Sequence, residues 1–528
     1  MHQIVFNHSR TSHRALILLT KTCLTTPQLK QLHSHLTVSG AIGDTLTARK
    51  LAAQLAVSDY SHAWTFLRHL PSKSGSIWTS SIRSLCENHH SENAISLANH
   101  MVRSGCYPDN YTFSFVFRAC AEISDVASAL MFHSLAVKLG WAGYDYVVNC
   151  LIHCYIGCDA MDNARKVFDE SSVRDVITWT AVINGYFKIG QLELAQKMFD
   201  EMPQRNEVSW SAMINGYAQM GMFMEALEAF NEMLASGVKP NQSGLVGAIS
   251  ACTHLGSLDQ GRWIHAYIDR NAIQLDGVVG TALVDMYAKC GSIDIARDLF
   301  EKIPRHERYA HAYTSLITGL ANHGESRAPL ELFRIMEEDG VCPSEATFVS
   351  VLSACSRIGL AEEGLRIFRR MEEVYGIVPG VRHYGCLVDM LARAGQLEEA
   401  DEVVRRMPME PSLSALGALL NACRVHGDVN LGKRTVDELS ERSLDHSGVH
   451  VLLSNIYASL DKWNEVAGVR ARMAEKRVQK VAGCSCIEVE GKVVEFVAGE
   501  KCLIDMNKMD ETIAALVRVE RHSKSLCT

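Results

Sequence analysis

The chain has 528 residues, 47% of them hydrophobic, and a formal net charge of −8, which suits a folded protein with a large core. This charge excludes a protein that binds nucleic acid through an overall excess of positive charge, so any phosphate-binding surface must be local. The apolar runs are too short to span a bilayer, which needs roughly 18 to 20 residues, so we expect no membrane partner.

The N-terminal residues are typical of an organelle transit peptide. The first acidic residue is Asp44, whereas basic, serine, threonine and histidine residues are frequent before it. We therefore interpret residues 1–20 as a transit segment. A polar N-terminus that lacks acids by chance is the alternative.

Internal repeats run through most of the chain. The segment Trp179–Tyr186 is closely copied at Trp210–Tyr217, 31 residues later, and further echoes indicate repeats of unequal length. About 12 repeats are expected in residues 21–412, the first of them weak. The predicted bounds of the others are 45–74, 75–109, 110–144, 145–175, 176–206, 207–241, 242–276, 277–309, 310–344, 345–380 and 381–412.

Each repeat carries two apolar stripes with helical spacing. In the repeat 207–241, Gly221 separates the stripes, and Gly237 with Pro240 ends the second. One helical hairpin is too small to bury its own apolar stripe, so neighbouring hairpins must stack. The pattern predicts an all-α, right-handed superhelical solenoid of helix-turn-helix repeats.

These features resemble a family, the plant pentatricopeptide repeat proteins, in the subclass that alternates standard, long and short repeats. The short repeats end in Met202-Pro203 and Ile303-Pro304, and a standard repeat ends in Gly237–Asn241. The resemblance implies binding of single-stranded RNA, one base per repeat, in a mitochondrion or chloroplast. The tetratricopeptide class is the alternative, but its 34-residue repeats do not vary in this way.

The resemblance also implies that two residues of each repeat read one base. They are the residue after the aromatic position of the first helix and the last residue of the repeat. Small polar side chains, which can hydrogen-bond to a Watson–Crick edge, occupy both positions in several repeats. These predicted reading pairs are Thr79 with Asp109, Asn149 with Asp175, Thr180 with Asn206, Ser211 with Asn241, and Thr314 with Ser344. For the first member, helix capping is the alternative interpretation.

The family's pairing rule assigns bases to the repeats from 75 to 241 in the order G, unspecified, U, A, A. The unspecified repeat begins at Asn110 and offers only Ser114 with Tyr144, and the repeat from Gln242 offers Val246 with Asp276. Thr281 is a further predicted reader that favours a purine. Its partner is undefined because about two extra residues precede Ala310.

The resemblance further implies that the second residue of each repeat wedges between neighbouring bases. The predicted base-stacking residues are Tyr146, Ile177, Val208 and Val278. Ser76 and His311 suit this role less well. Packing at the start of a helix is the alternative interpretation.

Beyond Ser412 the apolar rhythm changes. Residues 413–480 resemble the two C-terminal E motifs of editing factors, which are tetratricopeptide-like helical pairs, and alternation around Glu490-Gly491 predicts a small β-hairpin. We interpret residues 481–528 as a remnant of the further extension, with a hairpin and a terminal helix. Cys486 and Val494 replace the usual Trp and His of the family.

We expect no catalytic residues, cofactor or metal. A zinc deaminase needs His-x-Glu with a downstream Pro-Cys-x-x-Cys, and the tail contains neither before Thr528. His90-Ser91-Glu92 lies in an expected turn without a following cysteine pair. Cys150, Cys154 and Cys158 recur every four residues, but packing on an ordinary helix explains them.

The leading hypothesis is a site-recognition factor for C-to-U RNA editing. In this hypothesis the chain binds single-stranded organellar RNA and recruits a DYW-type deaminase and multiple organellar RNA editing factors in trans. An organellar factor for splicing, RNA stability or translation is one alternative. A helical protein-interaction scaffold is another, but it would not need a polar pair in each repeat.

Overall fold

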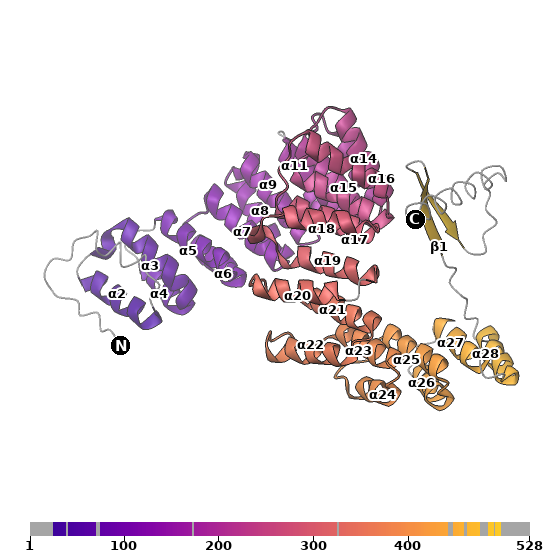
Figure 1. Ribbon diagram of the computed structural model, residues 1–528. Helices are drawn as coiled ribbons and strands as arrows, with labels where there is room; N and C mark the ends of the chain where they lie inside the picture. Colours follow the sequence, from indigo (N-terminus) through magenta and orange to yellow (C-terminus); the bar gives the residue numbers. More distant parts are fainter. Residues whose placement is uncertain are drawn as a thin grey trace. The chain divides into compact units, whose positions relative to one another are not determined.

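The computed structural model describes residues 25–38, 41–69, 74–171, 174–324, 327–441, 447–458, 462–475, 484–489 and 492–497. Within these ranges the protein is a succession of short helices followed by two strands (Figure 1). The predicted all-α repeat fold is confirmed. The proposed transit segment 1–20 and terminal helix lie outside the described residues.

The helices alternate between a first and a second helix of each hairpin. The first helices are α3 (Thr45–Ser58), α5 (Gly75–Glu87), α7 (Asn110–Glu122), α9 (Asp145–Gly157), α11 (Val176–Lys188), α13 (Glu207–Gln219), α15 (Gln242–Leu255), α17 (Gly277–Lys289), α19 (Ala310–Asn322), α21 (Glu345–Ile358), α23 (Val381–Arg393), α25 (Leu413–His426) and α27 (Ser447–Ala458). The second helices are α4 (Tyr60–His69), α6 (Ser91–Arg103), α8 (Val126–Lys138), α10 (Met161–Glu170), α12 (Leu192–Glu201), α14 (Phe223–Ala235), α16 (Leu258–Arg270), α18 (Ile293–Lys302), α20 (Ala328–Glu338), α22 (Ala361–Glu373), α24 (Leu397–Arg406), α26 (Val429–Glu441) and α28 (Trp463–Glu475). Helix α2 (Thr26–Val38) precedes them, and three short 3-10 helices are η1 (Ala41–Gly43), η2 (Trp141–Gly143) and η3 (Arg305–Glu307).

Every repeat start predicted between residues 45 and 381 is the first residue of a first helix. Gly221 between α13 and α14, and Gly237 after α14, both have φ of 77°. This left-handed conformation costs little for glycine and lets the chain reverse after a helix. Local turn chemistry therefore places the helix ends.

The contacts group the chain into two compact bodies. The first consists of Met1–Met222 and Ala229–Gly244, and the second of Phe223–Glu228 and Leu245–Thr528. In the first body, the first helices from α3 to α13 pack on one another in chain order; in the second, those from α17 to α27 do the same. Within each of these two series, a hairpin thus completes its core against its neighbours, as the repeat pattern predicts.

The repeated Asn-Gly-Tyr sequence has a packing reason. A Cβ atom added at Gly216 on α13 would lie 2.4 Å from the ring of Phe187 on α11, which is buried. A Cβ atom at Gly185 on α11 would likewise lie 3.0 Å from the side chain of Ile156 on α9. Glycine therefore lets successive first helices approach closely.

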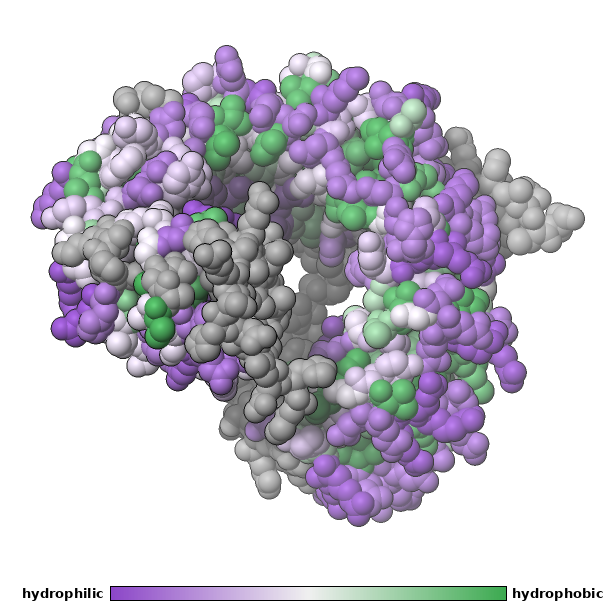
Figure 2. Space-filling model, turned by 90° about the vertical axis from the view of Figure 1, so that its left-hand side faces the viewer, coloured by the Kyte–Doolittle hydropathy of each residue, from purple (hydrophilic) through white to green (hydrophobic). Residues whose placement is uncertain are grey.

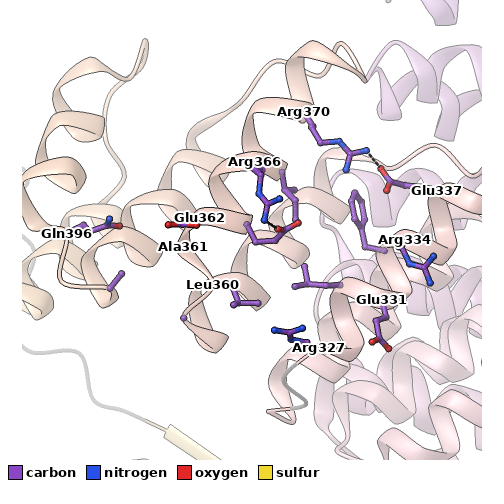
Figure 3. Close-up of a pocket in the computed structure, with 16 residues that line it drawn as sticks. Arg327, Glu331, Arg334, Glu337, Leu360, Ala361, Glu362, Arg366, Arg370 and Gln396 are labelled. Carbon is purple, nitrogen blue, oxygen red and sulfur yellow. Dashed lines mark hydrogen bonds and ion pairs between the residues drawn. The ribbon is translucent and has the colours of Figure 1, made fainter.

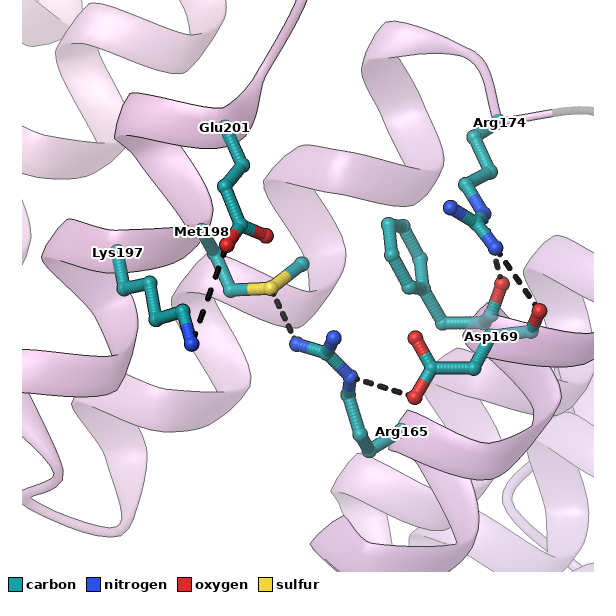
Figure 4. A network of polar contacts seen from close by, with 7 residues as sticks. Arg165, Asp169, Arg174, Lys197, Met198 and Glu201 are labelled. Carbon is teal, nitrogen blue, oxygen red and sulfur yellow. Dashed lines mark hydrogen bonds and ion pairs between the residues drawn. The ribbon is translucent and has the colours of Figure 1, made fainter.

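In each of three short repeats, an arginine near the end of the repeat packs over a phenylalanine ring. Arg174 and Arg205 donate Nε hydrogen bonds of 3.1 Å to the carbonyls of Phe168 and Phe199, and the guanidinium carbons lie 4.9 and 4.6 Å from those rings. Figure 4 shows Arg174 bonded to the backbone of Asp169 and Arg165 bonded to the carboxylate of Asp169. Arg308 forms the same arrangement with Phe300 and the carbonyl of Ile303. These contacts fix the residue before the next helix cap.

The C-terminal part contains two further helical pairs and two strands. Strands β1 (Cys484–Val489) and β2 (Lys492–Val497) pair antiparallel, with Val489 opposite Lys492. None of the helices among the described residues combines the length and the apolar character that a bilayer span requires.

Candidate nucleic-acid interface

The first member of each predicted reading pair is the fifth residue of a first helix. The hydroxyls of Thr79, Thr180 and Thr314 lie 3.0, 2.7 and 2.7 Å from the carbonyl oxygen four residues earlier, to which they donate. Thr180 and Thr314 keep only 7% and 9% of their surface exposed. Their hydroxyl hydrogens therefore point into the helix, so a ligand that reached these hydroxyls would meet oxygen lone pairs.

The second member of each pair is the N-cap of the following first helix. Asp109 and Asp175 accept backbone N–H bonds of 2.8 Å from Thr112 and Thr178, and Asn241 accepts one of 2.9 Å from Gly244. Helix capping was the alternative interpretation for the first member, but the capping side chains in the structure are those of the second members. The second member caps because the last residue of a repeat immediately precedes the next helix.

Two pairs are in direct contact. The Ser211 hydroxyl donates to Asn241 Oδ1 at 2.6 Å, and the Asn149 amide nitrogen lies 3.4 Å from Asp175 Oδ2. Residues 30 and 26 positions apart in sequence are thus brought together by the stacking of two repeats. The structure therefore brings the two members of each of these pairs into contact.

Two other pairs are joined through a third residue that the sequence analysis missed. Thr112 lies between Thr79 and Asp109, with both oxygen contacts at 2.7 Å. Thr347 lies between Thr314 and Ser344, at 2.8 and 3.0 Å. The sequence could have indicated these two residues, because each is a hydroxyl residue three positions after a helix cap, which is the spacing of a capping box.

The remaining predicted readers have local bonds only. Asn206 caps α13 and exchanges hydrogen bonds with Ser209, while Thr180 donates to its own helix. Thr281 donates to the carbonyl of Gly277, and the last residue of its repeat is Tyr309, which does not cap α19 with its side chain. The extra residues that obscured this repeat's register form η3.

The Asp175 carboxyl is held in its charged form. Burial raises the pKa of Asp175, but hydrogen bonds from Thr178 and Asn149 outweigh the burial and lower the pKa below 3.8. The carboxylate therefore accepts hydrogen bonds at neutral pH, as a reader of a base donor would need.

The predicted base-stacking residues share an exposed position at the start of the first helices. Their exposed fractions lie between 48% and 59%: Tyr146, Ile177, Val208 and Val278. Single exposed apolar side chains are common on protein surfaces, so this exposure makes the four residues accessible to a base and is compatible with the predicted role. On the face shown in Figure 2, hydrophobic side chains lie in small patches among hydrophilic ones.

Tyr111 occupies the same position in the repeat 110–144 and was missed. It is 59% exposed, and its ring centroid lies 6.5 Å from that of Tyr146. The two ring planes are inclined by 58°, so they form a tilted pair and would have to turn toward parallel before a flat base could stack between them. The repeat that lacks a clear reading pair thus has an aromatic pair.

A separate cavity of about 980 Å³ lies in the second body, mainly on second helices. Figure 3 shows charged side chains around it, with Arg370 bonded to Glu337 at 2.7 Å. None of the predicted reading residues lines this cavity. It is therefore distinct from the candidate nucleic-acid interface.

The cysteines noted in the sequence lie on α9 and in the turn that follows it. Burial raises the pKa of the Cys150 thiol. The Cys158 thiol donates to the carbonyl oxygen of Cys120, with 3.4 Å between sulfur and oxygen. Among the described residues there is no group of three or more His, Cys, Asp and Glu side chains that could hold a metal ion.

Family models match several parts of the chain. Models of the PPR repeat match residues 74–122, 174–207, 205–244 and 281–307, and a model of the pentacotripeptide-repeat region of PRORP matches 310–442. A model of the E motif matches residues 426–488.

Curated relatives cover almost the whole chain. A pentatricopeptide repeat-containing protein of Arabidopsis thaliana named as mitochondrial is 31% identical over 98% of this chain and 92% of its own length. The chain belongs to the pentatricopeptide repeat family. A putative family member of Arabidopsis thaliana named as chloroplastic is 38% identical over 94% of this chain and 90% of its own length.

The fold agrees with this membership. The crystal structure of a pentatricopeptide repeat protein from maize superposes with a TM-score of 0.61 at 17% sequence identity, over 89% of this chain and 74% of the maize chain. The family resemblance predicted from the repeat signatures is confirmed.

Proposed function

We propose that this pentatricopeptide repeat protein binds single-stranded RNA in a mitochondrion or chloroplast and reads its sequence one base per repeat. The observation that carries the proposal is the recurring link between the fifth residue of a first helix and the N-cap of the next. The names of the two relatives, one mitochondrial and one chloroplastic, support an organelle location.

Capping determines which groups a reading pair offers to a base. At Asp109, one carboxylate oxygen accepts from Thr112, and the second oxygen remains as an acceptor. Asn206 and Asn241 use their amide oxygens for capping, so their amide hydrogens remain as donors. Aspartate and asparagine, although nearly isosteric, thus offer opposite hydrogen-bonding polarity.

This polarity matches the predicted bases. Guanine offers N1–H and N2–H donors at its Watson–Crick edge, which suit acceptors on Asp109 and Thr79. Adenine offers the N1 acceptor, which suits the amide donors of Asn206 and Asn241. Uracil offers the N3–H donor to Asp175, whereas cytosine would present a lone pair there. The proposed order is therefore G, unspecified, U, A, A along residues 75–241.

The C-terminal part of the chain indicates the process in which the proposed RNA binding takes part. The match to the E motif over residues 426–488 supports a site-recognition factor for C-to-U editing. In this proposal the chain selects the cytidine, and a DYW-type deaminase with other organellar editing factors performs the chemistry in trans. Cytidine deamination or stoichiometric zinc in the purified chain alone would overturn that division of labour.

Selection from randomised single-stranded RNA tests the reading register. We expect an enriched core of G-N-U-A-A. A different core would contradict the register, and no enrichment would favour a protein-interaction scaffold.

The substitution Asn149→Thr is a sharper test at one base. It replaces an amide by a hydroxyl beside Asp175, so preference at the third nucleotide should shift from U toward a purine while the other nucleotides keep theirs. An unchanged preference for U would contradict the assignment of Asn149 as a reader.

A further inference from the structure

A buried hydroxyl residue lies at the centre of one reading pair. Thr112 is the third residue of α7 and has 0% of its surface exposed. Its Oγ1 atom lies 2.7 Å from Asp109 Oδ1 and 2.7 Å from Thr79 Oγ1. Thr112 cannot touch a ligand, yet it contacts both residues proposed to read the base.

The number of hydroxyl hydrogens determines the direction of these bonds. The Asp109 carboxylate can only accept, so Thr112 donates its single hydroxyl hydrogen to Asp109. Thr112 therefore has no hydrogen left for Thr79. The Thr79 hydroxyl hydrogen must point either to Thr112 Oγ1 or to the carbonyl oxygen of Gly75. Both directions lead into the protein, so Thr79 and the second oxygen of Asp109 offer only acceptors outward.

The same position holds the pair in the repeat 145–175. The Thr178 hydroxyl lies 2.5 Å from Asp175 Oδ1 and 2.7 Å from Asn149 Oδ1. Both of these oxygens are acceptors, so the single hydroxyl hydrogen of Thr178 can serve only one of them at a time. The Asn149 amide nitrogen lies 3.4 Å from Asp175 Oδ2, so Thr178 contacts both residues of this pair. Thr347 bridges Thr314 and Ser344 in the second body.

Repeats without this hydroxyl are arranged differently. The third residue of α15 is Gly244, where an added Cβ atom would lie 2.9 Å from Ser211 Oγ. The space is needed because Ser211 bonds directly to Asn241. The third residue of α17 is Val279, and the corresponding fifth residue, Val246, offers no hydroxyl to bridge. The bridge thus occurs in three of the five predicted pairs. The pair of Ser211 and Asn241 bonds directly, and Ser209 on α13 bonds to Asn206 but not to Thr180.

We infer that the third residue of the following helix, at Thr112, Thr178 and Thr347, is a positioning residue that sets the base preference of the preceding repeat. This inference rests on the proposed function. Base preference would then depend on three residues from two repeats, of which one never meets the RNA.

Two valine variants of the full chain test this inference. Thr112→Val and Thr178→Val keep the branched shape and the backbone N–H that bonds the cap, and remove only the bridging hydroxyl. Affinities are measured for RNAs that differ only at the first or third nucleotide of the G-N-U-A-A core. Thermal unfolding is followed in parallel.

We expect Thr112→Val to lower the preference for G over A at the first nucleotide by about tenfold, the scale of one disrupted hydrogen bond to a charged group. The preference for U at the third nucleotide should not change. Thr178→Val should do the converse, so each variant is the control for the other. Thr112→Ser, which retains the hydroxyl, should keep the preference for G.

Three results would overturn the inference. Unchanged preferences in both variants would show that the hydroxyl has no effect. A uniform loss of affinity for every RNA would assign these threonines to helix stability alone. A wild-type chain that does not discriminate at either nucleotide would remove the proposed function and the inference with it, whereas discrimination that survives in the variants removes the inference only.

Discussion

Replacing Asp109 by asparagine should change which purine the repeat 75–109 prefers. Asparagine and aspartate cap helices about equally well, so the bond from the Thr112 backbone, 2.8 Å in the wild type, should persist. The outward oxygen, however, becomes an amide that donates. In the variant, the donor groups of guanine would then face the donating amide of the new side chain, whereas the N1 acceptor of adenine would gain a hydrogen bond from it.

The size of this effect follows from the cost of an unsatisfied donor. That cost is about 1 to 3 kcal/mol, so affinity for RNA with G at the first nucleotide should fall by roughly five- to 150-fold. Fluorescence anisotropy on two RNAs that differ only in G or A at this nucleotide measures it. We expect the order of preference to change from G over A to A over G.

Asp125 provides a matched control for the Asp109 substitution. Its carboxylate caps α8, a second helix, with a bond of 3.0 Å from the backbone of Ser128, and it belongs to no reading pair. Asp125→Asn should therefore leave base preference unchanged. The reasoning is refuted if Asp109→Asn still prefers G, or if Asp125→Asn shifts the preference equally.

Three further outcomes are expected. The Asp175→Asn variant should be less stable than the wild type at neutral pH. Because the pKa of Asp175 is lowered below 3.8, the difference in melting temperature between the wild type and this variant should shrink only as the pH falls through that lowered pKa. A melting-temperature gap that already closes near pH 6 would contradict this. Gly216→Ala should lower the free energy of unfolding by about 1 to 3 kcal/mol in urea titrations, since the new methyl would overlap the Phe187 ring; an unchanged midpoint would show that the ring can move aside. Tyr111→Ala and Tyr146→Ala should each weaken RNA binding by about 1 kcal/mol or more without changing base preference, which binding isotherms on the same RNA set would reveal. A changed preference would instead make these rings readers.

The sequence by itself determined the succession of helices and where each begins. Helix ends depend on local chemistry: glycine after a helix, a short polar residue before the next one, and apolar spacing in between. The helix starts at Asn110, Val176 and Ala310, for example, follow from the unequal repeat lengths read from the sequence. The position of Tyr111 was equally readable, because it is the second residue of a correctly bounded repeat.

Only the tertiary structure decided how the candidate reading residues are bonded. Thr79 and Thr112 are 33 positions apart, and no local pattern indicates that their hydroxyls meet. The closure of Arg205 over Phe199 likewise depends on how the chain turns between two helices. Helix starts are set by a few neighbouring residues, whereas the direction of a hydroxyl hydrogen is set by every acceptor within reach. Those acceptors come together only when the repeats stack.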